Sequence, residues 1–331
     1  MMEQRRFGST DLRVSTIGFG GWAIGGPAMA GSQPIGWGIV DDTTSAQALR
    51  EAFDHGITFY DTADVYGFGH SEELIGRAFA NRKDVVIATK VGHRQGSDGS
   101  LTLDYSRDHI LRSCKESLKR LRRDCIDYYQ LHSARVGHLR QGDCIEAMEQ
   151  LQQSGLIRYW GLSLNTFTPA PEADHMMRQK LGNGFQLVLN ILNQRAVPLL
   201  ERMREAGYGI IVRMPLQFGL LTGKFNPGTT FGKNDHRAFR LTPEVLAAAM
   251  PPLEKAWTIA KRNSASKTSL ALGFCSSFKE VSTIIPGIKT PGQARENTAG
   301  IVDLTTDDRQ MLLSLYGSHF QSVVDLMENQ G

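Results

Sequence analysis

The chain contains the stretch Gly56-Ile57-Thr58-Phe59-Tyr60-Asp61-Thr62-Ala63-Asp64-Val65-Tyr66-Gly67, which is one unit of a repeated pattern. Segment 58–61 is short, apolar and aromatic, and we expect a buried strand there. It follows a helical pattern over 43–55 that ends at Gly56, a residue suited to the end of a helix. A second helical pattern, over 71–80, comes after the loop. The unit therefore predicts a strand between two helices.

The alternation of strand and helix continues along most of the chain. Strands are expected at 16–21, 58–61, 85–90, 126–131, 159–163, 185–189, 209–212 and 281–285. Helices are expected at 43–55, 71–80, 107–121, 145–154, 169–180, 199–206, 252–262, 268–277 and 291–299. Counted from residue 16, this pattern gives eight strand–helix units.

Apolar strands that alternate with helices indicate a parallel sheet covered by helices. With eight units, the expected fold is a (β/α)₈ TIM barrel of the α/β class. The alternative is an open, doubly wound sheet, which predicts a Gly-x-Gly-x-x-Gly motif after the first strand. Gly18 and Gly20 fit the start of that motif, but Ala23 stands in place of its third glycine. The pattern therefore favours the barrel.

Three segments lie outside the repeat. Residues 5–14 predict an N-terminal β-hairpin that plugs the bottom of the barrel, and we expect an extra helix near the C-terminus. The loop 219–241 is rich in Gly, Phe and Asn and follows the seventh strand. Long loops are usually functional or disordered, and we expect this one to cover a bound ligand at the rim of the barrel. Residues 1–331 are predicted to form a single domain.

The composition is ordinary for a globular protein, with 41% hydrophobic and 21% charged residues. A signal peptide and a membrane span are not expected, because the chain lacks a suitable apolar run. The net charge of +3 does not argue for a nucleic-acid partner. The four cysteines form no Cys-x-x-Cys pair, which is typical of reduced thiols in a cytoplasmic protein. We therefore expect a cytoplasmic protein whose partner is a small molecule.

Barrel enzymes carry their catalytic residues at the carboxyl ends of the strands. The polar residues at or just beyond these ends are Asp61, Tyr66, Lys90, His132, Ser163 and Asn165. A tyrosine hydroxyl has a reference pKa of about 10, and an ammonium group beside it would lower that pKa. Lys90 would play this part for Tyr66, and Asp61 would pair with Lys90.

His132 would hydrogen-bond a substrate oxygen or relay a proton. The set as a whole suits carbonyl reduction or alcohol oxidation, with hydride from a cofactor. A metal hydrolase built on Asp61 and His132 is disfavoured, because the chain offers no His-x-His or His-x-x-x-His pair beside them. No metal site is predicted.

Many ordered motifs make the chain resemble the aldo-keto reductases over nearly its whole length, closest in pattern to the bacterial members and the potassium-channel β-subunit branch. The motifs lie at 20–22, 61–67, 69–73, 88–90, 127–132, 161–163, 215–216, 219–224 and 285–287. The resemblance implies a catalytic set of Tyr66, Lys90, Asp61 and His132. It also implies a nicotinamide cofactor, usually NADPH, bound across the barrel mouth without a Rossmann domain and covered by the loop 219–241.

The resemblance also implies the residues that bind the cofactor. They are Gly21, Trp22, Ser163, Asn165, Gln186, Arg213, Pro215, Leu216, Gly219, Leu221, Gly223, Lys224, Gly287, Lys289, Gln293, Glu296 and Asn297. Leu164 separates Ser163 from Asn165, which are adjacent in most relatives. Arg213 stands where many members have a stacking aromatic ring, and its charge should favour the neutral, reduced nicotinamide.

The site for the 2′-phosphate also departs from the family pattern. Many NADPH-specific members have Lys, Ser and Arg where this chain has Gly287, Ile288 and Gln293. Lys289 remains as a cation that can bind the phosphate, unless it is a solvated loop residue. NADPH is therefore favoured, and NADH stays open.

The predicted function is NAD(P)H-dependent reduction of aldehydes or ketones, or the reverse reaction. The alternative is a cofactor-bound regulatory or redox-sensing subunit with little turnover. The expected pocket is lined by Trp22, Tyr66, Phe68, His93 and Arg94. His93 and Arg94 would attract an anionic substrate if they are not simply solvated. The physiological substrate, the direction of reaction and the oligomeric state, a homo-oligomer included, are left open by the sequence.

Overall fold

The computed structural model describes residues 2–80, 82–96, 98–232 and 235–330. Its centre is a sheet of eight parallel strands that pair in chain order. They are β3 (Phe19–Gly20), β6 (Phe59–Asp61), β7 (Val86–Val91), β10 (Ile126–His132), β11 (Ile157–Ser163), β12 (Gly184–Val188), β13 (Gly209–Arg213) and β14 (Thr283–Ile285). Bridges from Ile17 to Ile284 and from Gly20 to Gly287 close the sheet. The predicted (β/α)₈ barrel is confirmed.

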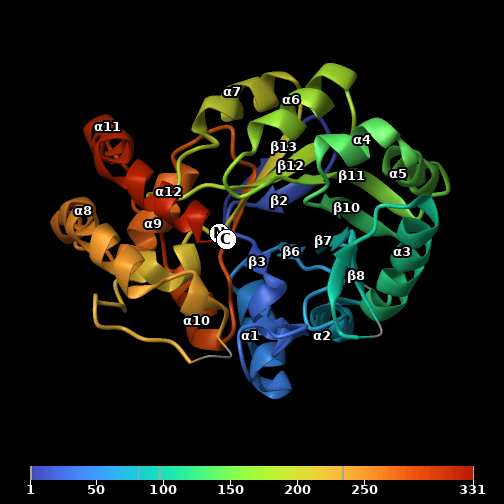
Figure 1. Cartoon of the computed structure of the whole chain (residues 1–331), viewed down its shortest axis with the longest axis horizontal. Coiled ribbons are helices and arrows are strands. Elements are labelled where there is room, and N and C mark those ends of the chain that lie inside the picture. Colours follow the sequence, from blue (N-terminus) through green and yellow to red (C-terminus); the bar gives the residue numbers. More distant parts are fainter. Residues whose placement is uncertain (1, 81, 97, 233–234, 331) are drawn as a thin grey trace.

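Helices surround the strands, as Figure 1 shows. They are α1 (Asp42–Asp54), α2 (His70–Phe79), α3 (Arg107–Leu121), α4 (Val136–Gln141), α5 (Asp143–Gln153), α6 (Ala170–Gln179), α7 (Val197–Glu205), α8 (Pro243–Arg262), α9 (Lys267–Ser276), α10 (Pro291–Thr298), α11 (Thr306–Leu315) and α12 (Gln321–Asn329). Short 3₁₀ segments are η1 (Gly21–Gly25), η2 (Gln217–Thr222) and η3 (His236–Phe239). A π-helical segment, η4 (Tyr316–Phe320), precedes α12.

The stretch around Gly56 shows how the local sequence forms one unit. α1 begins where the Asp41 carboxylate accepts a hydrogen bond from the Thr44 amide at 2.7 Å, as N-cap residues do. It ends at Asp54, and Gly56 follows with φ +89°, a left-handed conformation that glycine adopts without strain. β6 then runs buried through the barrel and places Asp61 at its carboxyl end.

Some helices and hairpins differ from the sequence-based expectation. The helix expected over 252–262 begins at Pro243, because Thr242 caps it and Pro251 and Pro252 are accommodated inside it. The extra C-terminal helix is a pair, α11 and α12, joined by η4. α4 and the hairpins β4 (Met29–Ala30)–β5 (Gln33–Pro34) and β8 (His93–Gln95)–β9 (Leu101–Leu103) have no counterpart among the predicted elements.

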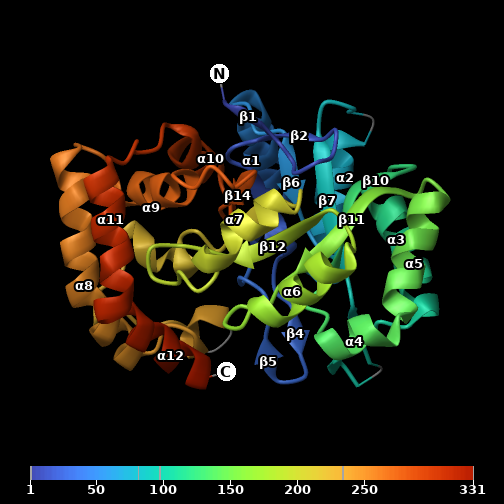
Figure 2. The same cartoon turned by 90° about the horizontal axis from the view of Figure 1, so that it is seen from above.

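The predicted N-terminal hairpin is formed by β1 (Gln4–Arg6) and β2 (Arg13–Ser15). Figure 2 shows it at one end of the barrel, opposite β4, β5 and α12. Phe7, at its turn, is fully buried and lies edge-on to Tyr128 with ring centroids 4.8 Å apart. A Cβ at Gly184 or Gly209 would come within 2.6 Å of the Phe7 ring. Glycine at these two positions lets the plug enter the barrel.

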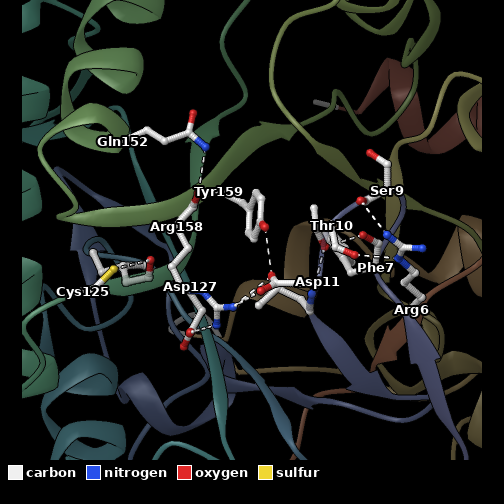
Figure 3. A network of polar contacts seen from close by, with 12 residues as sticks. Arg6, Phe7, Ser9, Thr10, Asp11, Cys125, Asp127, Gln152, Arg158 and Tyr159 are labelled. Carbon is white, nitrogen blue, oxygen red and sulfur yellow. Dashed lines mark hydrogen bonds and ion pairs between the residues drawn. The ribbon is translucent and has the colours of Figure 1, made fainter.

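Charged side chains join the hairpin to the bottom of the barrel, as Figure 3 shows. Nη2 of Arg158 donates to both carboxylate oxygens of Asp11 at 3.0 Å, and the Tyr159 hydroxyl donates to Asp11 at 2.9 Å. Nη1 of Arg158 donates to Asp127 at 3.0 Å. The side chain of Asp11 is 68% exposed and that of Arg158 is 40% exposed. Water screens such contacts, so each contributes little to stability.

Candidate active site

Lys90 and Asp61 form a buried ion pair at the carboxyl ends of β7 and β6. Nζ of Lys90 donates to Oδ2 of Asp61 at 2.6 Å and to the carbonyl oxygen of Thr62 at 2.7 Å. The same nitrogen donates to the Tyr66 hydroxyl at 3.2 Å. Lys90 is 0% exposed and Asp61 is 2% exposed. Three of the four residues predicted to act together are therefore in direct contact.

Two glutamine side chains hold the second oxygen of Asp61. Nε2 of Gln130 donates to Oδ1 at 3.1 Å, and Nε2 of Gln186 donates to it at 2.7 Å. A buried carboxylate is costly unless it is paired and hydrogen-bonded. Both oxygens of Asp61 have donors here, so the carboxylate is fixed and in turn fixes the Lys90 ammonium.

The charges in this cluster follow from burial and from the ion pair. Burial opposes the positive charge of Lys90, but Asp61 and Tyr66 outweigh burial and raise the pKa of Lys90 above its ordinary value. Burial raises the pKa of Tyr66, and Lys90 only partly offsets this rise. The expectation of a lowered Tyr66 pKa is thus wrong in its net direction, because the spacing of residues does not show how deeply the phenol is buried. At neutral pH Tyr66 is protonated and able to donate its proton.

His132 lies at the end of β10, edge-on to Tyr66, with ring centroids 6.0 Å apart. The Tyr105 hydroxyl donates to the carbonyl oxygen of His132 at 2.6 Å and so holds its backbone. Burial, followed by the neighbouring His93 and nearby cations, lowers the pKa of His132 well below its ordinary value. His132 is therefore a neutral imidazole at physiological pH, and it joins the other three residues predicted to be catalytic.

These side chains face a cleft of about 820 Å³. Trp22 stacks on Tyr66 with centroids 5.8 Å apart, and Trp37 lies edge-on to Trp22 at 5.5 Å. Phe218 completes the aromatic wall, 6.0 Å from Trp37. Lys90 lies behind Tyr66 and Asp61 and does not line the cleft. A mostly apolar cleft with a few convergent polar groups is typical of a small-molecule site.

Most of the residues implied as cofactor contacts line this same cleft. Those that do are Trp22, Asn165, Gln186, Arg213, Pro215, Leu216, Gly219, Lys224, Gly287, Lys289, Gln293, Glu296 and Asn297. Those that do not are Gly21, Ser163, Leu221 and Gly223. Gly21 lies against β6, where an added Cβ would meet the Asp61 carbonyl oxygen at 2.7 Å. Asn165 uses Oδ1 to accept from the amides of Phe167 and Thr168, so this oxygen shapes the loop before α6.

The turn after β13 carries several of these residues in a strained conformation. Met214, Gln217 and Phe218 have φ values of +54°, +44° and +56°. The buried side chain of Asn190 holds the turn: its Nδ2 donates to the Met214 carbonyl at 2.9 Å and to Oε1 of Gln217 at 2.8 Å. Such strain persists where surrounding structure enforces it, often at functional sites.

Several cleft residues in and beyond the loop 219–241 were not predicted from the sequence. His236 lies edge-on to Trp22 at 4.9 Å, and the Arg237 guanidinium lies 4.8 Å from the Phe231 ring. Arg240, and Met327 of α12, also line the cleft. The basic and aromatic residues of this loop were the available signal. Their side chains come to the cleft through η3 and a long connection, which strand-end positions do not reveal.

Phe68 and Arg94 were expected to line the active-site cleft, but they do not. They line a neighbouring surface cleft of about 450 Å³, which shares His93, Val65 and Leu101 with the first. Phe68 has φ +51° and lies in the turn between Tyr66 and α2. Arg94 contacts Asp104 at 3.4 Å. Of the two residues expected to attract an anion, only His93 reaches the active site.

Among the residues that the structure describes, no group of three or more His, Cys, Asp or Glu side chains is arranged to hold a metal ion. Within the same ranges, no helix is long and apolar enough to cross a membrane.

The family model described as "Aldo/keto reductase family" matches residues 16–316. The chain belongs to this family. It is 29% identical to an L-galactose dehydrogenase of Arabidopsis thaliana over 92% of this chain and 89% of the relative. It is 30% identical to an NADH-specific methylglyoxal reductase of Escherichia coli, covering 94% of this chain and 97% of the relative. The solved structure of a glycerol dehydrogenase from Gluconobacter oxydans matches with a TM-score of 0.77 and 30% identity, covering 96% of this chain and 95% of that one. The protein is therefore an oxidoreductase of the aldo/keto reductase family.

Proposed function

We propose that the protein reduces an aldehyde or ketone to an alcohol with NAD(P)H, or catalyses the reverse reaction. One observation carries the proposal: Nζ of Lys90 lies 2.6 Å from Asp61 and 3.2 Å from the hydroxyl of Tyr66, which faces an aromatic cleft. Tyr66 is the proposed general acid and base, assisted by Lys90, Asp61 and His132. The arrangement offers a proton to a substrate oxygen.

The residues of the cleft fit a nicotinamide dinucleotide. Nδ2 of Asn297 is buried and has no hydrogen-bond partner among the described residues, so it is free to bind a polar ring. Lys289 and Arg237 supply positive charge for phosphate groups. We propose that the cofactor is held by Gly21, Trp22, Ser163, Asn165, Gln186, Arg213, Pro215, Leu216, Gly219, Leu221, Gly223, Lys224, Gly287, Lys289, Gln293, Glu296 and Asn297, under the loop 219–241. The bound cofactor supplies hydride in reduction and accepts it in oxidation.

The chain's own residues handle the proton. In reduction, the Tyr66 hydroxyl donates its proton to the oxygen of the carbonyl group as that oxygen gains negative charge. Lys90 stabilises the phenolate that remains, and Asp61 holds Lys90 in place and charged. His132, neutral and beside Tyr66, donates a hydrogen bond that orients the carbonyl oxygen. In oxidation the same groups act in reverse order.

We propose that NADPH is the preferred cofactor. Burial, and then the nearby charge of Arg237, lowers the pKa of Lys289, and the carboxylate of Asp235, which pairs with Arg237 at 2.6 Å, partly offsets this. Lys289 is thus the cation that we expect to meet the 2′-phosphate. Nζ of Lys289 also donates to the Trp37 carbonyl at 3.2 Å, which fixes its position. Lys289→Met should weaken NADPH binding about ten-fold and leave NADH binding unchanged, as measured by titration of cofactor fluorescence. Equal losses for both cofactors would contradict the preference.

Arg213 is proposed to tune the cofactor's redox state. Its Nη2 donates to the Leu164 carbonyl at 3.1 Å and to Oγ1 of Thr166 at 3.0 Å, while Nε is buried without a partner among the described residues. A fixed positive charge beside the nicotinamide disfavours its cationic, oxidised form. Arg213→Tyr should lower the dissociation constant for the oxidised cofactor relative to that for the reduced cofactor. An unchanged ratio would remove this role from Arg213.

The test of the main proposal is the Tyr66→Phe variant, assayed by cofactor oxidation with a panel of aldehydes. We expect kcat to fall by roughly 10²–10⁴-fold while the dissociation constant for the cofactor stays within about two-fold. Tyr159→Phe is the matched control, because its hydroxyl contacts Asp11 at the opposite end of the barrel. Full activity of Tyr66→Phe would overturn the proposal.

The regulatory alternative predicts a different result for the wild-type protein. A cofactor-bound sensor would bind NADPH tightly but turn over the aldehydes no faster than Tyr66→Phe does. Direct contact among Lys90, Asp61 and Tyr66 favours the enzyme.

We further propose a class of substrate. The three relatives are named for L-galactose, methylglyoxal and glycerol, and each of these compounds has an oxygen on the carbon next to the one that reacts. The aromatic wall of the cleft suits the C–H faces of such small compounds. We therefore propose that the substrate of this protein also carries a second oxygen beside its carbonyl group.

A further inference from the structure

His93 is held rigidly at the side of the active-site cleft. Gly92, just after β7, has φ +135°, and an added Cβ there would meet the Tyr105 ring at 2.3 Å. The Asp104 amide donates to the Gly92 carbonyl at 2.9 Å, which ties the start of the β8–β9 hairpin to the segment before α3. These contacts fix the backbone before His93, and His93 itself pairs with Leu103 in the hairpin, so the fold sets where its ring lies.

The His93 ring packs edge-on against His132, with centroids 4.6 Å apart. Nδ1 of each ring is buried and has no hydrogen-bond partner among the described residues. Burial lowers the pKa of His93 to about 4, so its ring is neutral. A neutral imidazole has one N–H donor, and enclosing that donor at Nδ1 without an acceptor would be costly. The proton therefore belongs on Nε2.

His93 has no assigned task in the proton transfer. Tyr66 and His132 already serve the reacting oxygen, and His93 lies one ring farther along the same wall. An uncharged donor suits a hydroxyl or carbonyl oxygen and gives no ionic attraction to a carboxylate or phosphate. Arg94, the neighbour that could add positive charge, faces the other cleft.

We propose that His93 binds substrate by donating a hydrogen bond to the oxygen on the carbon next to the reacting carbonyl group. The substrates are then neutral α-hydroxy or α-oxo carbonyl compounds and the corresponding vicinal diols. This inference rests on the proposed function and names the residue that distinguishes its substrates from simple aldehydes.

The experiment measures kcat/KM for glyceraldehyde and for propanal, with concentrations corrected to the free aldehyde. The two compounds differ in the oxygen atoms beyond the carbonyl group. His93→Phe keeps a ring against His132 and removes the nitrogen, whereas His93→Gln keeps a donor and removes the ring. His175→Phe is the matched control, because His175 is a half-buried residue of α6 that lines neither cleft.

We expect the wild-type protein to prefer glyceraldehyde, and His93→Phe to lower the ratio of the two kcat/KM values about ten-fold or more. His93→Gln should recover part of that ratio, and His175→Phe should leave it unchanged. An unchanged ratio in His93→Phe, or an equal fall in His175→Phe, overturns the inference. If the wild-type protein reduces propanal but does not prefer glyceraldehyde, the inference about His93 is wrong and the proposed function still holds. A wild-type protein that reduces neither aldehyde overturns the proposed function as well.

Discussion

The two ends of the barrel each hold a carboxylate–cation network, but the networks differ in their access to water. At the bottom, Asp11 and Arg158 keep their charges largely in water, 68% and 40% exposed, while Phe7 seals the barrel below them. At the mouth, Lys90 and Asp61 have side chains 0% and 3% exposed. At the bottom, the buried side chain is apolar and the ion pairs are exposed, whereas at the mouth the ion pair itself is buried.

Partners for polar atoms differ in the same way. The carboxylate of Asp11 is fully engaged by Arg158 and Tyr159. At the mouth, Nδ1 of His93, Nδ1 of His132 and Nε of Arg213 are buried without hydrogen-bond partners among the described residues. Buried atoms without partners cost stability. The Tyr128 hydroxyl beside Phe7 is one as well, but the three residues at the mouth line the cleft, where a ligand can supply the missing partners. The comparison assigns stability to the bottom and chemistry to the mouth, in agreement with the general organisation of these barrels.

The largest expected effect comes from Lys90→Met, which breaks the buried pair. We expect kcat to fall by roughly 10²–10⁴-fold, because the phenolate of Tyr66 loses its cation. The free energy of unfolding should also fall by about 3–5 kcal/mol, since the Asp61 carboxylate is left buried without its partner. Steady-state kinetics and urea denaturation measure the two effects.

The double variant Asp61→Asn with Lys90→Met separates activity from stability. Removing both charges should restore part of the lost stability, whereas activity should stay low. If Lys90→Met kept wild-type kcat, the chemical role of the mouth network would be wrong.

Phe7→Ala tests the other end of the barrel. The ring is fully buried against Tyr128, and truncating it should lower the free energy of unfolding by about 3–5 kcal/mol. We expect kcat per folded molecule to stay within about two-fold, because the plug lies at the opposite end from Tyr66. Ile39→Ala, at a side chain that is 89% exposed, serves as the control and should change stability by less than about 0.5 kcal/mol. A large loss of kcat in Phe7→Ala would show that the two ends are coupled.

The sequence was sufficient to predict the barrel and to predict which residues gather in the cluster that we propose to be catalytic. Buried strands are short and apolar, and parallel strands end on one rim, so Asp61, Lys90 and His132 could be assigned to the same place. The start of α8 was not predictable in this way. Pro251 and Pro252 are typical of a helix start, whereas the structure accommodates them inside a helix that Thr242 caps.

The pKa values of the site residues were harder to predict than the identity of those residues. Proximity of Lys90 to Tyr66 was inferred correctly, but the net pKa of the phenol depends on burial, which the spacing of residues does not show. Phe68 was assigned to the wrong cleft and His236 was not identified, because each lies in a connection outside the strands of the barrel. Phe68 has a left-handed backbone conformation and lines the second cleft. His236 lies edge-on to Trp22 although the two residues are far apart in the chain.

Lowering the pH should reduce the free energy of unfolding, because buried histidines with lowered pKa values lie at the mouth of the barrel. Burial lowers the pKa of His236 to about 4, and His236 is 7% exposed. Below its ordinary pKa of 6.5, the unfolded chain takes up a proton that the folded protein takes up only near pH 4, so stability falls as pH drops from 7 to 5. For His236 this loss is about 1–2 kcal/mol at pH 5.

Urea denaturation at pH 7.5 and pH 5.0 tests this prediction. His236→Phe should lose less stability between the two pH values than the wild type does. His55→Phe, at an exposed position, should behave like the wild type. An equal acid sensitivity in His236→Phe and in the wild type would show that this ring is not the proton-linked group.

The smallest effect is expected for Asp11→Asn at the bottom. The substitution weakens the contacts with Arg158 and Tyr159, but these side chains are exposed, so the free energy of unfolding should fall by no more than about 1 kcal/mol. The difference should shrink further in 1 M salt, because salt screens exposed charges. Asp127→Asn is the matched comparison: its side chain is 11% exposed, and it accepts from Arg158 and from the Ile87 amide, so its loss should be larger. If Asp11→Asn destabilised the protein as strongly as Lys90→Met, exposure would not be what distinguishes the two networks, and the contrast between the ends of the barrel would have to rest on Phe7 alone.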